Sequence, residues 1–412
     1  MHHFEMRDGE LFAEEVRVAD LAAAHGTPLY VYSAATIRRH FDAFDSAFSG
    51  LDHLTCYSVK ANSNVNVLRL MGEQGAGMDI VSGGELHRAL TAGIPSGRIV
   101  YSGVGKRAEE IRAALEADIL MFNVESLAEL ARINDIAGDM GRKARISFRI
   151  NPDVDPKTHP YISTGMKKNK FGLDIEKSLE AYQLARDLPA IEPVGIDCHI
   201  GSQLTSINPF LEALDKILAF KARLDDMGLG IRHLDLGGGL GITYNEEEPP
   251  HPREFGEALT SRLKDMDLKV ILEPGRVIVG NAGILVTQVV YLKETPSKRF
   301  VIVDAAMNDL IRPSLYDSYH RIGEVAAHDR PKAKVDVVGP ICESGDFLAR
   351  DRELPGLEQG EYLAVYSAGA YGFAMSSNYN SRPRAAEILV DGSTARVIRR
   401  RESYDDLVAL EK

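Results

Sequence analysis

Four short polar segments of this 412-residue chain carry residue types used in covalent and cofactor chemistry. They are Tyr57–Asn62, His199–Gln203, Gly237–Gly241 and Glu273–Arg276, and each follows a short apolar run. Polar groups in such places stand at the ends of buried strands. The lysine, the histidine, the glycine run and the carboxylate of these segments are therefore the candidate functional groups.

Lys60 follows the apolar run 54–59. A lysine at the end of a buried strand is costly unless it is paired or neutralised. Covalent Schiff-base chemistry neutralises or delocalises its charge. The alternative is a lysine whose ammonium simply reaches solvent.

Gly238 and Gly239 lie in an uninterrupted glycine run followed by Leu240 and Gly241. Residues without side chains let backbone N–H groups come close to a phosphate. The alternative is a tight turn. The run matches neither the dinucleotide fingerprint nor a Walker P-loop.

Glu273 would be repelled by a neighbouring phosphate unless it has another partner, and a pyridinium nitrogen is such a partner. His199 offers a flat ring for stacking on an aromatic cofactor, and Ser202 offers a hydroxyl to a phosphate. Taken alone, a histidine in such a place is more often a hydrogen-bonded structural residue. Asp79 and Arg149 are further polar residues in apolar runs.

The elements that must position these groups are eight apolar runs alternating with helical patterns such as 84–92 and 109–117. Continuous apolar strands separated by helices predict a parallel sheet covered on both faces. Eight such units favour an α/β fold of the TIM type, a (β/α)₈ barrel. A doubly wound open sheet is the alternative, because periodicity cannot show closure. The runs are 54–59, 77–81, 98–102, 119–124, 145–150, 194–200, 233–237 and 270–274.

After residue 277 the strand-like segments follow one another with turns instead of helices, which predicts a mostly antiparallel β-sandwich or β-barrel domain. The strand-rich first 35 residues are expected to join it. We therefore predict a barrel over 36–276 and a discontinuous β domain over 1–35 and 277–412.

The composition of the chain argues against several classes of protein. The net charge of -12 argues against a nucleic-acid partner, which requires an excess of Lys and Arg. The three cysteines, Cys56, Cys198 and Cys342, fit neither a disulfide framework nor a zinc motif, so we expect no metal and a cytoplasmic location. The apolar stretch 277–292 is too short and polar to span a membrane, and no signal-peptide core is present.

In a (β/α)₈ barrel, functional groups collect at the C-terminal ends of the strands. The lysine, glycine run, carboxylate and histidine would then share one barrel mouth, where they fit pyridoxal 5′-phosphate. The lysine would bond to the cofactor aldehyde, and the carboxylate would keep the pyridine nitrogen protonated. A racemase would do better with a weaker electron sink, so Glu273 favours decarboxylation.

Taken in order, the four segments resemble the alanine racemase-like barrel decarboxylases, which use pyridoxal phosphate, and more closely the diaminopimelate decarboxylases. The closer resemblance extends from Pro28 to Arg384, and the one departure noticed is Ser58, where many members carry alanine. It rests on Asn151–Gly165, Lys170–Gly172, Gly339–Asp346 and Gly369–Arg384.

The resemblance implies a role for each matching residue. Lys60 is implied to be the Schiff-base lysine and Cys342 the proton donor, these two being the catalytic residues. The implied cofactor-binding residues are Lys60, Asp79, His199, Ser202, Gly238, Gly239, Glu273, Pro274, Gly275, Arg276 and Tyr371. The implied substrate-binding residues are Arg276, Arg312, Tyr316, Glu343 and Tyr371.

The implied reaction is decarboxylation of meso-2,6-diaminopimelate to L-lysine and CO₂, the last step of lysine biosynthesis. Arginines match the distal carboxylate of this substrate, and Glu343 can pair with its distal ammonium. The family also implies a homodimer with shared active sites. Without the resemblance, Arg312 and Tyr316 would be assigned to a surface loop and Cys342 to the core.

Two other functions stay open at this point. A decarboxylase of ornithine, lysine or arginine on the same fold would not need the arginines for a distal carboxylate. A non-catalytic binding relative would have no need of Lys60, Glu273 and Cys342.

Overall fold

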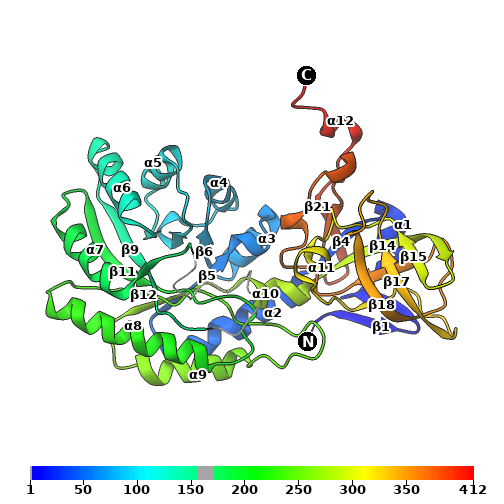
Figure 1. Ribbon diagram of the computed structural model, residues 1–412, viewed down its shortest axis with the longest axis horizontal. Coiled ribbons are helices and arrows are strands. Elements are labelled where there is room, and N and C mark those ends of the chain that lie inside the picture. The colour runs from blue at the N-terminus through cyan, green and yellow to red at the C-terminus, as the bar shows by residue number, and fades with distance from the viewer. Residues whose placement is uncertain (1, 156–169) are drawn as a thin grey trace. The chain divides into compact units, whose positions relative to one another are not determined.

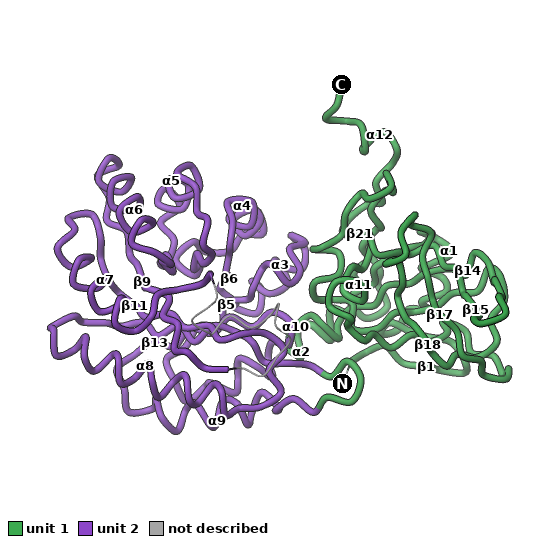
Figure 2. The backbone as a smooth tube through the Cα atoms, viewed as in Figure 1, with its two compact units in different colours: residues 1–40, 243–247, 278–412 green, residues 41–242, 248–277 purple. Residues whose placement is uncertain are grey.

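The computed structural model describes residues 2–155 and 170–412. The chain forms two compact units, shown in different colours in Figure 2. One comprises residues 41–242 and 248–277, and the other comprises residues 1–40, 243–247 and 278–412. Most of the motif Asn151–Gly165 lies outside the described residues.

The first unit is a closed barrel of parallel strands. Its strand order is β9-β11-β12-β13-β5-β6-β7-β8, and β8 pairs in turn with β9. This closure confirms the predicted (β/α)₈ barrel and excludes the open sheet. The strands are β5 (His53–Ser58), β6 (Gly77–Ile80), β7 (Ile99–Tyr101), β8 (Met121–Val124), β9 (Ala144–Asn151), β11 (Ile191–Asp197), β12 (His233–Asp235) and β13 (Lys269–Leu272), with β10 (Leu173–Asp174) beside β9.

Helices cover the outside of the barrel, as Figure 1 shows. Several begin at a capping side chain: Ser82 accepts from the backbone N–H of Glu85, and Ser126 accepts from that of Glu129. These caps fix the residue at which the loop ends and the helix begins. The helices are α3 (Val65–Glu73), α4 (Gly83–Thr91), α5 (Ala108–Ala117), α6 (Leu127–Asp139), α7 (Ile175–Asp187), α8 (Asn208–Asp226) and α9 (Pro252–Leu263).

The barrel interior changes character along its axis. Cys56 and Met121 belong to an apolar cluster with Val100, Val194 and Ile271. Two residues further along β5 and β8 stand Ser58 and Asn123, also buried. Alternate residues of a strand face the same side, so the interior is apolar at one end and polar at the C-terminal end.

The second unit is built on a nine-stranded sheet with the path β18-β17-β15-β14-β4-β20-β21, in which β19 also pairs with β14 and with β16. Among the strand pairs described in this sheet, only β15–β17 and β20–β4 are parallel, which confirms the mostly antiparallel β domain. Its strands are β4 (Leu29–Ser33), β14 (Gly283–Glu294), β15 (Arg299–Val303), β16 (Ile322–Glu324), β17 (Lys332–Val338), β18 (Phe347–Pro355), β19 (Tyr362–Val365), β20 (Ala386–Asp391) and β21 (Thr394–Arg399).

A small antiparallel sheet, β1 (Phe4–Arg7), β2 (Glu10–Ala13) and β3 (Val16–Arg17), belongs to the same unit. Its Leu11 shares a buried core with Val31 of β4, Ile284 of β14 and Ile388 of β20. The unit's short helices are α1 (Val18–His25), α11 (Arg312–Tyr316) and α12 (Tyr404–Leu407); α2 (Ala34–Asp45) and α10 (Arg276–Val279) span its boundaries. None of the helices described is long and apolar enough to cross a membrane.

Candidate active site

Lys60 lies in a single 3₁₀ turn, Val59–Ala61, that directly follows β5. Its Nζ lies 2.8 Å from Oδ2 of Asp79, which is fully buried in β6. The hydroxyl of Ser58 donates to the same oxygen at 2.8 Å. This ion pair explains how a lysine is tolerated here, because the carboxylate offsets the ammonium charge. Lys60 remains accessible, with 37% of its side chain exposed.

The glycine run after β12 is required by close packing. Gly237 and Gly239 have φ angles of 64° and 120°, which side chains rarely tolerate. A Cβ on Gly238 would overlap the carbonyl oxygen of Glu273, and one on Gly239 would come within 2.5 Å of the carbonyl oxygen of Gly201. The glycines therefore bring the ends of β11, β12 and β13 together.

His199 is held as a neutral ring. Its Nδ1 accepts from the N–H of Gly238 at 3.1 Å, so the neutral ring carries its proton on Nε2. Burial, and then the positive charges of Arg149 and Lys60, lower the pKa of His199 well below its ordinary value. Arg149 is itself engaged, because it pairs with Glu125 at 3.2 Å and donates to the carbonyl oxygen of His199 at 3.4 Å.

Glu273 follows β13 and is 5% exposed. The hydroxyl of Ser102 donates to its Oε1 at 3.3 Å, and Nδ2 of Asn123 lies 3.5 Å from the same oxygen. Burial, and then the negative charges of Asp235 and Asp79, raise the pKa of Glu273 well above its ordinary value. A cation placed beside this carboxyl would stabilise its ionised form.

The segment after Glu273 is tied to neighbouring loops. The carbonyl oxygen of Pro274 accepts from the N–H of Ser58 at 2.9 Å. A Cβ on Gly275 would lie 3.1 Å from the side chain of Ala61. Arg276 is 6% exposed and donates through Nη2 to the hydroxyl of Ser202 at 3.1 Å.

The remaining candidate residues belong to the β unit. Arg312 begins α11 and is 5% exposed. Its guanidinium lies 4.6 Å from the ring centroid of Tyr244, and Nη1 lies 3.2 Å from Nε2 of His320. A ring face attracts a cation, so Tyr244 restrains Arg312. Tyr316 is the last residue of α11.

Cys342 is exposed, and its N–H donates to Oδ1 of Asn380 at 2.9 Å. The adjacent Glu343 is exposed too, and accepts from the hydroxyl of Tyr379 at 2.9 Å. Tyr371 has a φ of 55°, in the left-handed region where a residue with a bulky side chain is strained. Backbone strain of this kind is found at functional sites.

The structure thus groups the candidate residues into two sets. The barrel set gathers the residues at the C-terminal strand ends: Lys60, Asp79, His199, Ser202, Gly238, Gly239 and Glu273–Arg276. The β-unit set comprises Arg312, Tyr316, Cys342, Glu343 and Tyr371.

The sequence analysis missed the residues that support both sets. Ser102, Asn123 and Asp235 form a hydrogen-bonded group with Glu273. Each is a polar residue near the end of an apolar run, and this feature of the sequence could have identified them. Tyr244 and His320 surround Arg312, and no feature of the sequence marks either residue.

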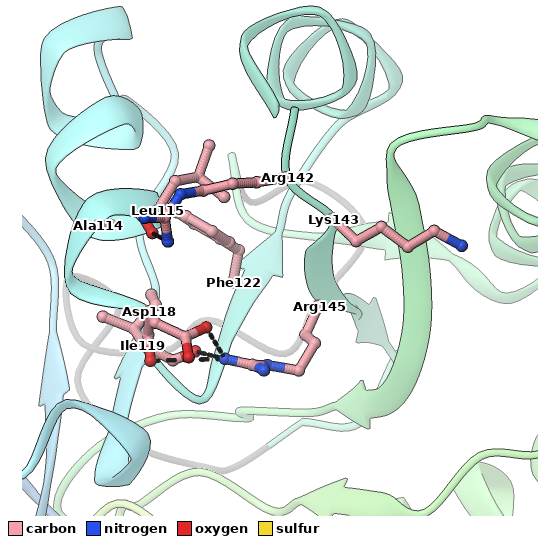
Figure 3. A pocket seen from close by; sticks show the side chains of 8 residues that line it. All are labelled: Ala114, Leu115, Asp118, Ile119, Phe122, Arg142, Lys143 and Arg145. Carbon is pink, nitrogen blue, oxygen red and sulfur yellow. Dashed lines mark hydrogen bonds and ion pairs between the residues drawn. The ribbon is translucent and has the colours of Figure 1, made fainter. Parts of the chain in front are cut away.

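A cavity of about 190 Å³ lies elsewhere on the barrel unit, between the end of α5 and the start of β9 (Figure 3). Arg145 donates there to Asp118 at 2.5 Å and to the carbonyl oxygen of Ile119 at 2.6 Å, while Arg142 donates to the carbonyl oxygen of Leu115 at 2.8 Å. These arginines donate to carbonyl groups at and just after the C-terminal end of α5. The cavity contains no candidate residue, and we assign it a structural role.

Within residues 2–155 and 170–412, no three His, Cys, Asp or Glu side chains are grouped so as to hold a metal ion. The barrel set instead consists of an amine, buried carboxyls, a neutral imidazole and a glycine loop.

Residues 34–280 match the family model for the pyridoxal-binding domain of pyridoxal-dependent decarboxylases. The chain belongs to this family. It is 56% identical to the diaminopimelate decarboxylase of Aquifex aeolicus, over 98% of this chain and 96% of that protein. It is 54% identical to the diaminopimelate decarboxylase of Haemophilus influenzae, over 100% of this chain and 99% of that protein.

A crystal structure of diaminopimelate decarboxylase from Helicobacter pylori, complexed with L-lysine, has a TM-score of 0.93 and 46% identity, covering 95% of this chain and 98% of that chain. The chain is therefore a member of the diaminopimelate decarboxylase family, as its motifs predicted.

Proposed function

We propose that this protein decarboxylates meso-2,6-diaminopimelate to L-lysine and CO₂ with pyridoxal 5′-phosphate as cofactor. The observation that carries the proposal is the Lys60–Asp79 pair and the buried Glu273 at the same end of the barrel. Membership of the diaminopimelate decarboxylase family supports the substrate.

The barrel set fits the cofactor. Oδ1 of Asp79 is buried and has no hydrogen-bond partner among the described residues, so the site has a polar atom still to be satisfied. Glu273 is a buried carboxyl whose ionised form needs a cation. Bound pyridoxal phosphate supplies an aldehyde that reacts with primary amines and a ring that withdraws electrons from the substrate α-carbon.

Each residue of the barrel set then has a task. Lys60 would bond covalently to the cofactor, and Asp79, whose Oδ2 lies 2.8 Å from Nζ, would hold and orient the amine. Glu273 would stabilise a positive charge at the ring nitrogen, and the flat neutral ring of His199 would stack on the cofactor. The phosphate and ring are held further by Ser202, Gly238, Gly239, Pro274, Gly275, Arg276 and, from the β unit, Tyr371.

The β-unit set recognises the substrate. Arg312, together with Arg276 of the barrel set, binds the distal carboxylate through charged hydrogen bonds, and Glu343 pairs with the distal ammonium. Tyr316 and Tyr371 contact the substrate beside them. Cys342 donates the proton that replaces the lost carboxyl group on the α-carbon.

We further propose a cytoplasmic homodimer in which Cys342 and Glu343 of one subunit complete the barrel site of the other. Both residues are exposed on the single chain. A two-fold interface repeats its contacts, so each dimer would have two composite sites.

The experiment that tests the reaction measures CO₂ released from meso-diaminopimelate, ornithine, lysine and arginine by the protein with pyridoxal phosphate. We expect release from meso-diaminopimelate far above the other three. Preference for another amino acid would support the rival decarboxylase, and no release from any substrate would support the non-catalytic relative.

The covalent role of Lys60 is tested on the same preparation. Borohydride reduction should fix the cofactor to the peptide that contains Lys60 and abolish the visible band of the Schiff base. A modified peptide elsewhere in the chain would contradict the assignment.

A further inference from the structure

The C-terminal end of the barrel interior holds an unusual number of buried polar side chains. Barrels of this type are filled mainly by Val, Ile and Leu. Here the interior contains four carboxyls that are at most 5% exposed, together with buried hydroxyls and one amide. The carboxyls are Asp79, Asp197, Asp235 and Glu273, and the neutral polar groups are Ser58, Ser102, Asn123 and Ser147.

The amide of Asn123 lies at the centre of this polar layer. Its Nδ2 donates to Oδ2 of Asp235 at 3.1 Å. Their strands, β8 and β12, are separated by β9 and β11 in the barrel, so this bond crosses the interior. Asn123 is 0% exposed and has no access to water.

The hydrogen bonds around Asn123 form a chain with one direction. The hydroxyl of Ser147 donates to Oδ1 of Asn123 at 2.6 Å. Nδ2 of Asn123 donates to Oγ of Ser102 at 3.1 Å, and the hydroxyl of Ser102 donates to Oε1 of Glu273 at 3.3 Å. Such chains strengthen each member bond by polarisation.

The direction of this chain matters because a hydroxyl carries a single proton. Since Ser102 accepts from Asn123, its own proton is left to point at Glu273. Hydrogen bonds donated to a carboxylate favour its ionised form. They act against the burial and the neighbouring charges of Asp235 and Asp79 that raise the pKa of Glu273.

The charged groups around Glu273 make such support necessary. Asp235 and Asp79 oppose its ionisation, whereas Lys60 and Arg149 favour it. Lys60 is bonded to Asp79 and Arg149 to Glu125, so much of their charge is already compensated. A neutral donor next to Glu273 supports the charged form without bringing a counter-charge that would compete with the cofactor.

We propose that Asn123 is a positioning residue that, through Ser102, holds Glu273 ionised and directed at the cofactor ring nitrogen. The inference rests on the proposed function, since it requires pyridoxal phosphate to be bound with its ring nitrogen at Glu273. Asn123 itself touches neither the cofactor nor the substrate in this assignment.

The test uses the holoenzyme loaded with pyridoxal phosphate that is ¹⁵N-labelled in the ring. The ¹⁵N chemical shift reports whether the ring nitrogen is protonated, independently of turnover. In Asn123→Leu, which keeps a similar volume without the amide, we expect the signal to move from the protonated towards the unprotonated position while the cofactor stays bound. We expect kcat to fall roughly 10- to 100-fold with little change in KM, the scale of one hydrogen bond to a charged group.

Three further variants keep the test decisive if Asn123→Leu fails to fold. Ser102→Ala removes the hydroxyl that donates to Glu273 at 3.3 Å and leaves the longer 3.5 Å contact from Nδ2 of Asn123. It should shift the ring signal in the same direction, whereas Ser102→Thr keeps the hydroxyl and should retain the wild-type signal. Ser178→Ala is the matched control: it deletes a buried hydroxyl of α7 that donates to the carbonyl oxygen of Asp174, away from the polar layer. It should leave the signal unchanged.

A wild-type ring signal in folded, loaded Asn123→Leu or Ser102→Ala would overturn the inference and leave the proposed function intact. Failure of the wild-type protein to bind the labelled cofactor would contradict the proposed function, and the inference with it. The wild-type spectrum distinguishes the two failures, because it shows whether the protein binds the labelled cofactor at all.

Discussion

The barrel set and the β-unit set differ in how their chemistry is supported. In the barrel, Asp79 and Glu273 are buried and bonded to neighbours of the same unit. In the β unit, Cys342 and Glu343 are exposed. A buried set is organised before any ligand arrives, whereas an exposed pair acquires a low-dielectric environment only when another surface covers it.

Arg312 is the exception within the β-unit set. It is 5% exposed and is held by the ring of Tyr244 and by His320. A guanidinium restrained in this way loses less side-chain entropy on binding a carboxylate. In the proposed homodimer, the β unit would therefore contribute one preorganised group, Arg312, and two groups that another surface must cover, Cys342 and Glu343.

The largest effect is expected from separating the two sets onto different subunits. Lys60→Ala and Cys342→Ala should each be nearly inactive. When the two are mixed under conditions that let dimers exchange, half of the dimers would be heterodimers, each with one intact site. Activity should then recover to roughly a quarter of wild type for a two-fold assembly.

The control mixes Lys60→Ala with the double variant Lys60→Ala/Cys342→Ala, which has no intact site in any pairing. If mass spectrometry confirms exchange and activity does not return in the first mixture, both groups come from one chain. The comparison between the sets would then describe two halves of a site within a single subunit.

The next largest effect concerns the charge in the barrel set. Glu273→Gln keeps the shape of the side chain but cannot hold the ring nitrogen protonated. We expect it to retain the cofactor and to lose on the order of a hundredfold or more in kcat, the scale of removing a preorganised electrostatic group. Turnover close to wild type would show that this carboxyl faces something else.

These predictions depend on features that differ in how far the sequence reveals them. The apolar runs predicted the barrel strands because parallel strands are buried on both faces. The contact between Asn123 and Asp235 was not predictable, because it joins residues 112 positions apart across the barrel interior. Such a contact follows from barrel closure, which no local pattern encodes.

Tyr244 shows a second limit. It follows β12 in the sequence, between barrel elements, yet residues 243–247 belong to the β unit. Its contact with Arg312 therefore joins a short excursion of the chain to a distant helix. Residue type and spacing identified Arg312 only through family resemblance, and gave no indication of the ring that restrains it.

A smaller effect is expected at Arg312 because only one end of the substrate is involved. Arg312→Leu should weaken the reaction of meso-diaminopimelate by a charged hydrogen bond, about 1.5–3 kcal/mol in kcat/KM. It should hardly affect any residual reaction of lysine, which lacks the distal carboxylate. Equal losses on the two substrates would mean that Arg312 is structural.

The smallest effect is expected at a buried acid outside the candidate site, which can be compared with the buried acids inside it. Asp309 of the β unit is 2% exposed, and burial raises its pKa to about 7. Its carboxyl accepts from the N–H of Ala306 at 3.0 Å. In the unfolded chain an aspartate has a pKa of about 3.9, so between pH 4 and 7 only the folded chain keeps this proton. The contribution of Asp309 to stability is therefore largest below pH 4 and is lost as the pH rises to 7.

Asp309→Asn removes this titration while keeping an oxygen for the N–H of Ala306. From pH 5 to pH 6, the free energy of unfolding of the wild type should fall by about 1.4 kcal/mol relative to that of the variant. This is the change expected per pH unit when the folded and unfolded states differ by one bound proton. Urea unfolding of the wild type and of Asp309→Asn can be followed by circular dichroism at each pH, so that the contributions of the other acids cancel in the difference. If the difference between wild type and variant is the same at pH 5 and 6, Asp309 titrates normally. Burial alone would then not suffice to hold a proton in this unit, and the raised pKa values in the barrel would have to come from the mutual repulsion of its clustered carboxyls.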